Sequence, residues 1–165
     1  MDLTIFLDSF LGDPWTYGPV LLLYTIAATV FLPIPEEVGL LDPFLPWYLL
    51  VMILAVGKTI GAALIYPLGD RLGRLTARWV ERLPWLAPWF ERLQGLVGRY
   101  GAYALYAVLS IPFMTDTLPI YAFALLNPPK GERRIAWLPF LSANFLAGLT
   151  RGTLFLAVPL LLGWP

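Results

Sequence analysis

The positions of the basic residues constrain this chain more than any other feature of its sequence. The chain is 59% hydrophobic, with a mean hydropathy of +0.72, which is typical of a membrane protein. Its loop cations occupy only two connections: Arg71, Arg74, Arg78, Arg82, Arg92 and Arg99 in the first, and Lys130, Arg133 and Arg134 in the second. Basic connections mark the cytoplasmic side of a membrane. The pattern predicts an all-α integral protein of the cell membrane, with residues 69–99 and 129–134 in the cytoplasm.

Two segments are long enough to cross a bilayer, which takes about 20 mostly apolar residues. They are residues 47–68 and residues 135–163, and aromatic residues that could anchor them at the membrane interface stand near their ends. Between them, residues 69–99 are predicted to form two basic amphipathic helices on the membrane surface, the first of which ends at Pro84.

Two further apolar stretches are interrupted by proline and acidic residues. Residues 19–44 contain Pro33 and Pro35, and residues 100–128 contain Pro112 and Pro119. If both stretches turn back inside the membrane as re-entrant hairpins, every loop cation lies on one side and both termini lie outside. If residues 100–128 instead cross once as a bent span, the two basic connections face opposite sides, so the hairpins are favoured.

The predicted fold is therefore a single membrane domain over residues 1–165. It has two full transmembrane helices and two facing, proline-broken hairpins in pseudo-symmetric halves. Residues 1–68 form the first half, residues 69–99 the cytoplasmic connector, and residues 100–165 the second half. Duplicated halves with broken helices are common in transporters.

Lys58 and Arg151 are the two cations that lie inside the predicted spans. A cation at that depth is costly and is a candidate for function, although pairing with an acid is an equally good reason for its presence. We expect Lys58, Arg151 and the neighbouring Asn144 to bind a substrate.

Three acids, Glu36, Glu37 and Asp116, follow the predicted turns and are candidates for proton coupling or gating. The alternatives are that the glutamates are solvated in an external loop, and that Asp116 caps the helix starting near Leu118. Four glycines at helical spacing are expected at close helix contacts: Gly57, Gly61, Gly148 and Gly152.

The composition removes several kinds of chemistry. The chain has no cysteine and no histidine, so thiol chemistry, Cys/His zinc sites and serine–histidine catalysis are excluded. Eleven acidic and eleven basic residues argue against a nucleic-acid partner. We expect no enzymatic activity, no metal and no cofactor, although hydrolysis by paired carboxylates stays open.

Three blocks of the sequence resemble the DedA family of membrane proteins, also called the SNARE-associated or VTT-domain family. They are VFLPIPEEVGLL, with Glu37 at the family's turn acid; GKTIGAALIYPLGDRLGR, with its spaced glycines; and YGAYALYAVLSIPFMTDTLPIYAFALL, in which Pro112 and Tyr121 fit the second turn. The chain departs from the family at Leu109 and Thr115, where arginines are common, near Thr25, where an acid is usual, and at Ala124, where glycine is usual. It resembles a short, divergent member.

The resemblance implies two facing re-entrant hairpins and translocation of lipids such as polyprenyl phosphates, with proton coupling as an option. We therefore expect a transporter of an anionic or phosphorylated lipid, whose partners are membrane lipids and their anionic headgroups. The alternatives are a proton-coupled exporter of small molecules and a structural or assembly protein without transport. The oligomeric state is left open, with a homo-oligomer among the options.

Overall fold

The computed structural model describes residues 14–31, 34, 36–40, 45–82, 87–113, 115–127 and 134–161. In these ranges all regular structure is helical: α2 (Pro14–Val30), the short 3₁₀ helix η1 (Glu36–Leu40), α3 (Trp47–Arg82), α4 (Ala87–Leu109), α5 (Thr117–Leu126) and α6 (Trp137–Leu161). The prediction of an all-α protein is confirmed for this part of the chain.

Two of these helices are long and apolar enough to cross a membrane. They include the segments Trp47–Gly69 of α3 and Trp137–Ala157 of α6, in agreement with the predicted spans. The remaining apolar helices, Thr16–Val30 and Thr117–Leu126, are shorter. The distinction predicted between full spans and shorter arms therefore exists in the structure.

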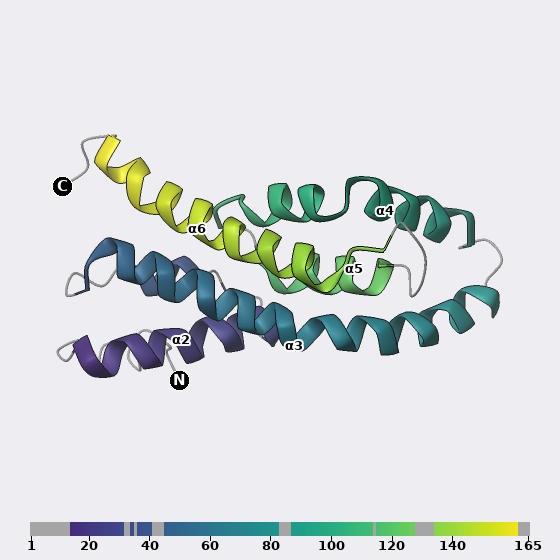
Figure 1. Cartoon of the computed structure of the whole chain (residues 1–165), viewed down its shortest axis with the longest axis horizontal. Helices are drawn as coiled ribbons and strands as arrows, with labels where there is room; N and C mark the ends of the chain where they lie inside the picture. Colours follow the sequence, from purple (N-terminus) through teal and green to yellow (C-terminus); the bar gives the residue numbers. More distant parts are fainter. Residues whose placement is uncertain are drawn as a thin grey trace.

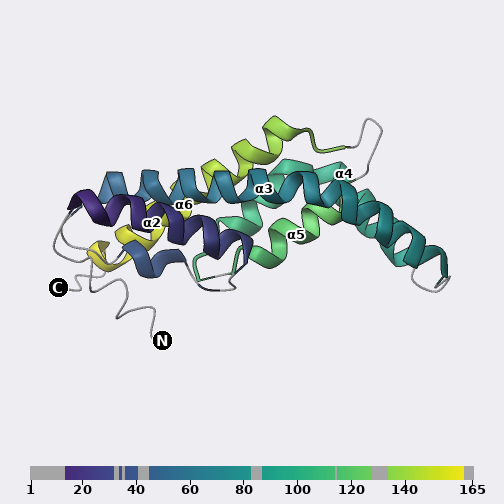
Figure 2. The ribbon, with the colours of Figure 1, turned by 90° about the horizontal axis from the view of Figure 1, so that it is seen from below.

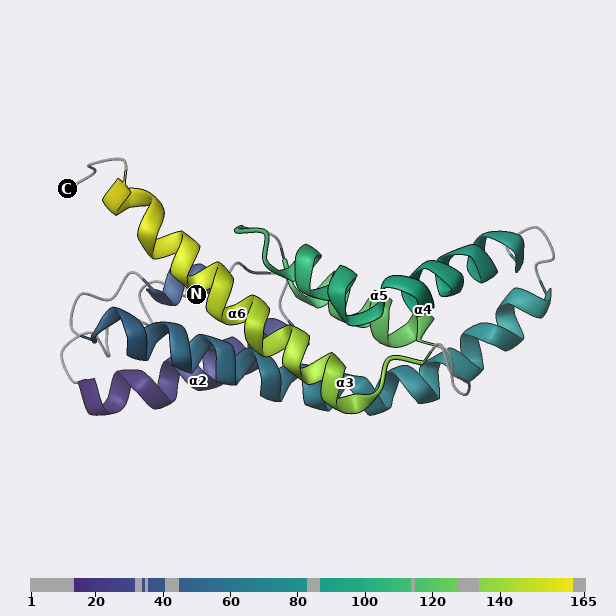
Figure 3. The ribbon, with the colours of Figure 1, turned by 45° about the horizontal axis from the view of Figure 1, so that its top comes forward.

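Helix α3 runs the length of the molecule and positions the other elements (Figure 1). It contacts α2, η1, α5 and α6 (Figure 2), and its first half, around Ala55 and Gly57, packs against both α6 and α2. Helix α6 crosses α3 obliquely and also contacts η1 and α4 (Figure 3). Both candidate spans therefore lie at the centre, and the shorter helices pack around them.

The first candidate span and the predicted first surface helix form one continuous helix, with no break between them. Helix α3 is 36 residues long in total, and it continues through Pro67 to Arg82. A proline inside a helix removes one backbone donor and bends the helix, but the flanking turns can still continue it. The structure does not describe the side chains of the arginines at positions 71, 74, 78 and 82.

The second surface helix also continues into the apolar arm that follows it. Helix α4 joins both segments, with a kink at Gly101, where φ is +42° and ψ is −122°. Only glycine adopts such a backbone at little cost. The kink lies one residue beyond the boundary predicted at residues 99 and 100.

Around Lys58, helix α3 buries a charged side chain and exposes apolar side chains. Met52, Val56, Ile60, Leu64 and Leu68 form an exposed stripe at every fourth position of α3, whereas Lys58 on the same helix is buried. Residues four apart share one helix face. A water-soluble helix has the opposite arrangement, so this stripe suits contact with lipid.

Two apolar cores hold the helices together. One includes Leu21, Leu50 and Leu54, and the other includes Ile65, Leu105 and Phe140. Along α3, Lys58 falls between Leu54 of the first core and Ala62 of the second. The charged residues therefore lie where the two cores adjoin.

Candidate functional site

Lys58 lies at the middle of the first candidate span, eleven residues from Trp47 and eleven from Gly69. Its side chain is fully buried, and its Nζ is 2.6 Å from Asp116 Oδ2. The same nitrogen donates a hydrogen bond of 3.4 Å to the carbonyl oxygen of Leu109 at the end of α4. Lys58 therefore connects α3 to both sides of the turn between α4 and α5.

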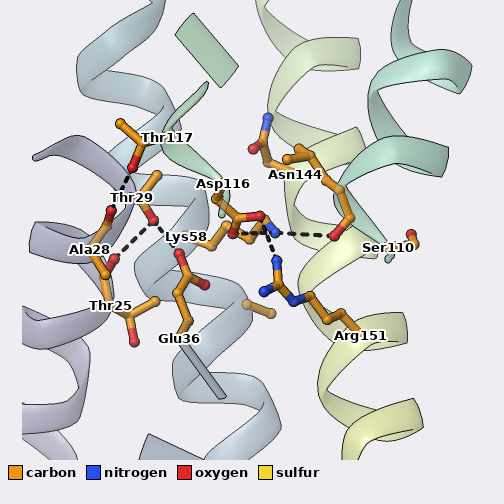
Figure 4. A network of polar contacts seen from close by, with 12 residues as sticks. Thr25, Ala28, Thr29, Glu36, Lys58, Ser110, Asp116, Thr117, Asn144 and Arg151 are labelled. Atoms are coloured by element: carbon orange, nitrogen blue, oxygen red, sulfur yellow. Dashed lines mark hydrogen bonds and ion pairs between the residues drawn. The ribbon is translucent and has the colours of Figure 1, made fainter. Parts of the chain in front are cut away.

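Arg151 on α6 joins two carboxylates from distant parts of the chain. Its Nη1 is 2.6 Å from Asp116 Oδ1, and its Nε donates to Glu37 Oε1. Asp116 thus bridges Lys58 and Arg151, as Figure 4 shows. We call Glu36, Glu37, Lys58, Asp116 and Arg151 the charged cluster; none of the five exposes more than 3% of its surface.

The segments around the start of η1 and the turn after α4 meet at this cluster. The Phe113 amide, in the turn after α4, donates a 2.8 Å hydrogen bond to Glu37 Oε1, at the start of η1. Thr117 Oγ1, at the start of α5, donates to the carbonyl oxygen of Ala28 in α2 at 3.0 Å. Hydrogen bonds between these segments satisfy backbone groups that a broken helix leaves free.

Asp116 does not cap α5, although it occupies the N-cap position. It makes no side-chain capping hydrogen bond. Its two oxygens instead face Lys58 and Arg151. The alternative that Asp116 is only a helix cap is therefore wrong, because two cations compete for the carboxylate.

Glu36 is bound differently from the other two acids. Its Oε1 is 2.7 Å from the Thr29 hydroxyl, which is also 2.8 Å from the carbonyl oxygen of Thr25 (Figure 4). A hydroxyl has one hydrogen, so it cannot donate fully to two acceptors at once. Both short contacts are satisfied when the Glu36 carboxyl carries a proton and donates it to Thr29.

The charge count agrees with a protonated Glu36. Three acids and two bases leave one negative charge without a positive partner if every group is ionised. A buried charge without a partner is costly, and groups in such places tend to become neutral. Glu37 and Asp116 have direct ion pairs, whereas Glu36 bonds to a neutral hydroxyl.

The cluster and the neighbouring Asn144 still contain polar atoms without a hydrogen-bond partner among the described residues. They include Arg151 Nη2, Glu36 Oε2, Glu37 Oε2 and Asn144 Oδ1. Unpaired buried groups cost free energy, and in native structures they often belong to functional sites. A guanidinium with a free donor can bind an oxygen of a phosphate or carboxylate.

Asn144 lies beside the cluster and is fully buried. Its Nδ2 donates to the carbonyl oxygen of Phe140 one turn earlier, at 2.8 Å. This bond occupies the amide nitrogen and leaves the amide oxygen unpaired. Asn144 can therefore offer an acceptor to a ligand, but it makes no bond to Arg151 in this structure.

The four predicted packing glycines stand at close contacts. A Cβ atom on Gly57 would lie 2.8 Å from Thr25 Cβ, and one on Gly61 would lie 2.6 Å from Thr29 Cβ. On α6, a Cβ on Gly148 would lie 2.8 Å from Ala55 Cα, and one on Gly152 would lie 3.2 Å from Val51 Cγ2. These glycines bring α2 and α6 close to α3, so that Thr29 and Arg151 reach the cluster.

The predicted turn prolines have different outcomes. Pro112 lies in the turn after α4, where Phe113 has a φ of +61°. Pro119 lies inside α5 and not in a turn, so that prediction is wrong. Proline fits the first turn of a helix, whose amides have no partner within the helix. Pro33 and Pro35 lie outside the described residues.

Sequence reasoning missed Thr29 and the Phe113 amide. Thr25 and Thr29 are four apart on α2, as Gly57 and Gly61 are on α3, and each threonine faces one glycine. That matching spacing was a signal for Thr29. No side-chain pattern could reveal a backbone amide as the partner of Glu37.

The described residues contain no group of three or more potential ligand side chains arranged to hold a metal ion. No protein-family model matches the chain, and no curated protein or solved structure matches it.

Proposed function

We propose that this chain is an integral membrane transporter that moves an anionic or phosphorylated lipid between leaflets, in the manner of the DedA family. One observation carries the proposal. Lys58 and Arg151, on the two candidate spans, are buried together with three acids from η1 and the turn before α5, and the Arg151 guanidinium has one donor without a partner among the described residues. A cation at the centre of a span costs about 2.5–3.5 kcal/mol on insertion scales, so such residues are functional candidates.

In the proposed membrane arrangement, α3 and α6 cross the bilayer. The segments 14–40 and 102–126 enter from opposite sides as re-entrant hairpins, and their turns meet near the midplane. Two observations support this arrangement: the hydrogen bond from the Phe113 amide to Glu37, and the bond from Thr117 to Ala28. Irregular backbone is tolerated at membrane depth only where it is buried in protein or lines water.

In the proposed transport step, the lipid phosphate replaces a carboxylate as the partner of Arg151. The structure then represents a closed state, in which Glu37 and Asp116 occupy the guanidinium. Arg151 Nη2 is the first donor for the phosphate, and Lys58 provides the second positive charge once Asp116 moves away. A planar guanidinium suits phosphate oxygens because it can donate two parallel hydrogen bonds.

We assign proton coupling to Glu36. The sequence favoured Glu37, but Glu37 is held in an ion pair with Arg151, whereas Glu36 bonds to a hydroxyl that already has a carbonyl acceptor. Loss of the Glu36 proton would add a negative charge beside Lys58 and Arg151 and would draw them away from a bound phosphate. The proton would therefore favour phosphate binding.

A structural role is the second candidate, and the ion pairing itself favours it. Lys58, Asp116, Arg151 and Glu37 form a continuous chain of salt bridges that joins α3, α6 and both turns. Such a network could serve only to hold the helices in register. In that case the charges would never exchange partners.

Replacement of Arg151 by lysine separates the two candidates. Lysine keeps the charge, but a single ammonium cannot serve Glu37, Asp116 and a phosphate oxygen together. We expect Arg151→Lys to insert and fold, and to reduce transport of fluorescent phosphatidylglycerol in proteoliposomes at least tenfold. Arg92→Lys, an exposed arginine on α4, is the matched control and should transport like the parent. Parental transport by Arg151→Lys would remove Arg151 from the binding site.

A further inference from the structure

A groove lies on the outer face of the protein between α4 and α6, away from the charged cluster. Its larger part is a cavity of about 590 Å³ with a mainly apolar lining. Tyr103 and Tyr106 on α4, and Leu138, Ser142 and Leu146 on α6, form its walls. Tyr103 and Leu138 are among the most exposed large apolar side chains described, so the groove opens outward.

A second, smaller cavity of about 250 Å³ continues this groove toward the start of α6. The two cavities share Ala102, Tyr103 and Pro139. Arg99 and Arg134 line the smaller cavity, and the described residues of its lining include no acid. The groove is therefore positively charged at one end and apolar along the rest.

The kink at Gly101 shapes the charged end. Arg99 precedes the kink and Tyr103 follows it, and both line the smaller cavity. A Cβ atom on Gly101 would lie 3.5 Å from Ile135 Cγ1, so the kink also brings α4 close to the segment before α6. Arg134, next to Ile135, places its guanidinium over the Tyr66 ring at 5.8 Å, which fixes the direction of this second cation.

The groove is charged at one end and apolar along the rest, as a phospholipid is. Trp137 begins the second candidate span, and the charged end lies at that end of the helix. The apolar part follows α6 from Leu138 to Leu146, into the hydrocarbon region of the proposed arrangement. Two arginines at the interface attract a phosphate, and an apolar trough beneath them accepts a hydrocarbon chain.

We propose that this groove binds one anionic phospholipid, with its phosphate between Arg99 and Arg134 and an acyl chain along the trough. Tyr106, in the wall of the trough, shares a 3.0 Å hydrogen bond with Thr150, which precedes Arg151 in the sequence. The groove is a docking site from which a lipid reaches the cluster. This last step rests on the proposed function, whereas lipid binding in the groove requires only that α6 spans the membrane.

Site-specific fluorescence quenching tests the docking site. The chain has no cysteine, so Ser142→Cys gives one thiol in the trough for a bimane label. We expect brominated phosphatidylglycerol to quench this label at a severalfold lower mole fraction than brominated phosphatidylcholine. The preference should disappear in Arg99→Gln and in Arg99→Gln/Arg134→Gln, and should persist in Arg92→Gln. A label at Leu154→Cys, exposed on α6 but outside the groove lining, should show no preference.

Several results would overturn the docking site. Equal quenching by both lipids at position 142 would mean ordinary lipid contact, and no quenching by either would mean that protein, such as a second copy of the chain, covers the groove. Because Arg99→Gln alone leaves the Arg134–Tyr66 contact in place, it tests the site even if the double variant fails to fold. Quenching requires no transport. A lipid preference in a protein that transports nothing would therefore contradict the proposed function while leaving the docking site in place.

Discussion

Arg151 and Lys58 are placed where a charge costs the most, and acids offset that cost. Removing one member of a buried ion pair typically costs about 3–5 kcal/mol, because the other charge is left without a partner. In this cluster Asp116 bridges both cations and Glu37 pairs with Arg151. The acids are therefore not equivalent. Glu36 is bonded to the Thr29 hydroxyl, so a negative charge on Glu36 does not contribute to an ion pair that stabilises the fold.

Substitution of single glutamates by glutamine tests this difference. Glu36→Gln should unfold at nearly the parental temperature, because the glutamine amide can donate to Thr29 as a protonated carboxyl does. Glu37→Gln should be clearly less stable, because Arg151 loses one of its two carboxylates. Thermal unfolding in detergent measures both. Equal destabilisation by the two substitutions would show that Glu36 carries a charge in the folded protein.

The same pair of variants tests proton coupling. Glu36→Gln imitates the protonated acid permanently, so transport should persist and lose its dependence on pH. Thr29→Val removes the hydroxyl that holds Glu36 and should shift the pH profile without abolishing transport. A parental pH profile in Glu36→Gln, measured in proteoliposomes, would assign coupling to another group.

At this scale the sequence singled out all five charged residues, because charges in apolar stretches stand out in any hydropathy pattern. It could not say which acid meets which cation, since Arg151 and Glu37 are 114 residues apart. The distinction between Glu36 and Glu37 depends on Thr29. Its position follows from the close approach of α2 to Gly61, which only the fold reveals.

At the scale of the elements, glycines set the distances between the helices that carry the cluster. A Cβ atom on Gly148 would lie 2.8 Å from Ala55 Cα, so a methyl group there would push α6, which carries Arg151, away from α3. Gly95 on α4 is different: a Cβ atom there would meet nothing within 4 Å. The two glycines form a matched pair for substitution by alanine.

We expect Gly148→Ala to destabilise the protein by about 1–3 kcal/mol, the usual cost of overpacking. Gly95→Ala should stabilise it by up to about 1 kcal/mol, since alanine is the better helix former. Thermal unfolding measures both, and transport by Gly148→Ala should fall with the displacement of Arg151. A parental unfolding temperature for Gly148→Ala would contradict the close packing of α3 and α6.

The two long helices could be predicted because continuous apolar runs between aromatic anchors are a strong local signal. The continuity of α3 and α4 across the predicted breaks could not be predicted. Pro67 did not end α3, and Gly101 kinked α4 without ending it. A single proline or glycine has a local cost that neighbouring turns and tertiary contacts can offset. Pro119 was misplaced for a related reason, since the first turn of a helix accepts proline.

At the scale of the whole molecule, the one-sided distribution of cations predicts the orientation. Residues 69–99 and 129–134 should both face the cytoplasm, and both termini should lie outside. Trp85→Cys and Gly131→Cys, in a chain without other cysteines, should react with a membrane-impermeant thiol reagent from the same, cytoplasmic side. Reaction from opposite sides would eliminate the two-hairpin arrangement and leave residues 100–128 as a single bent span.

Transport by the unmodified chain tests the central claim most directly. The purified protein is reconstituted into liposomes, and the movement of fluorescent lipids that share acyl chains but differ in headgroup is measured between leaflets. Because Arg151 and Lys58 are proposed to bind a phosphate without a compensating positive charge, phosphatidic acid and phosphatidylglycerol should cross several times faster than phosphatidylcholine. Both anionic lipids should cross faster than they do in protein-free liposomes. Phosphatidylcholine should cross either faster than in protein-free liposomes or at the same rate. Rates equal to those of protein-free liposomes for every headgroup would contradict the account and leave the charged cluster as a structural lock.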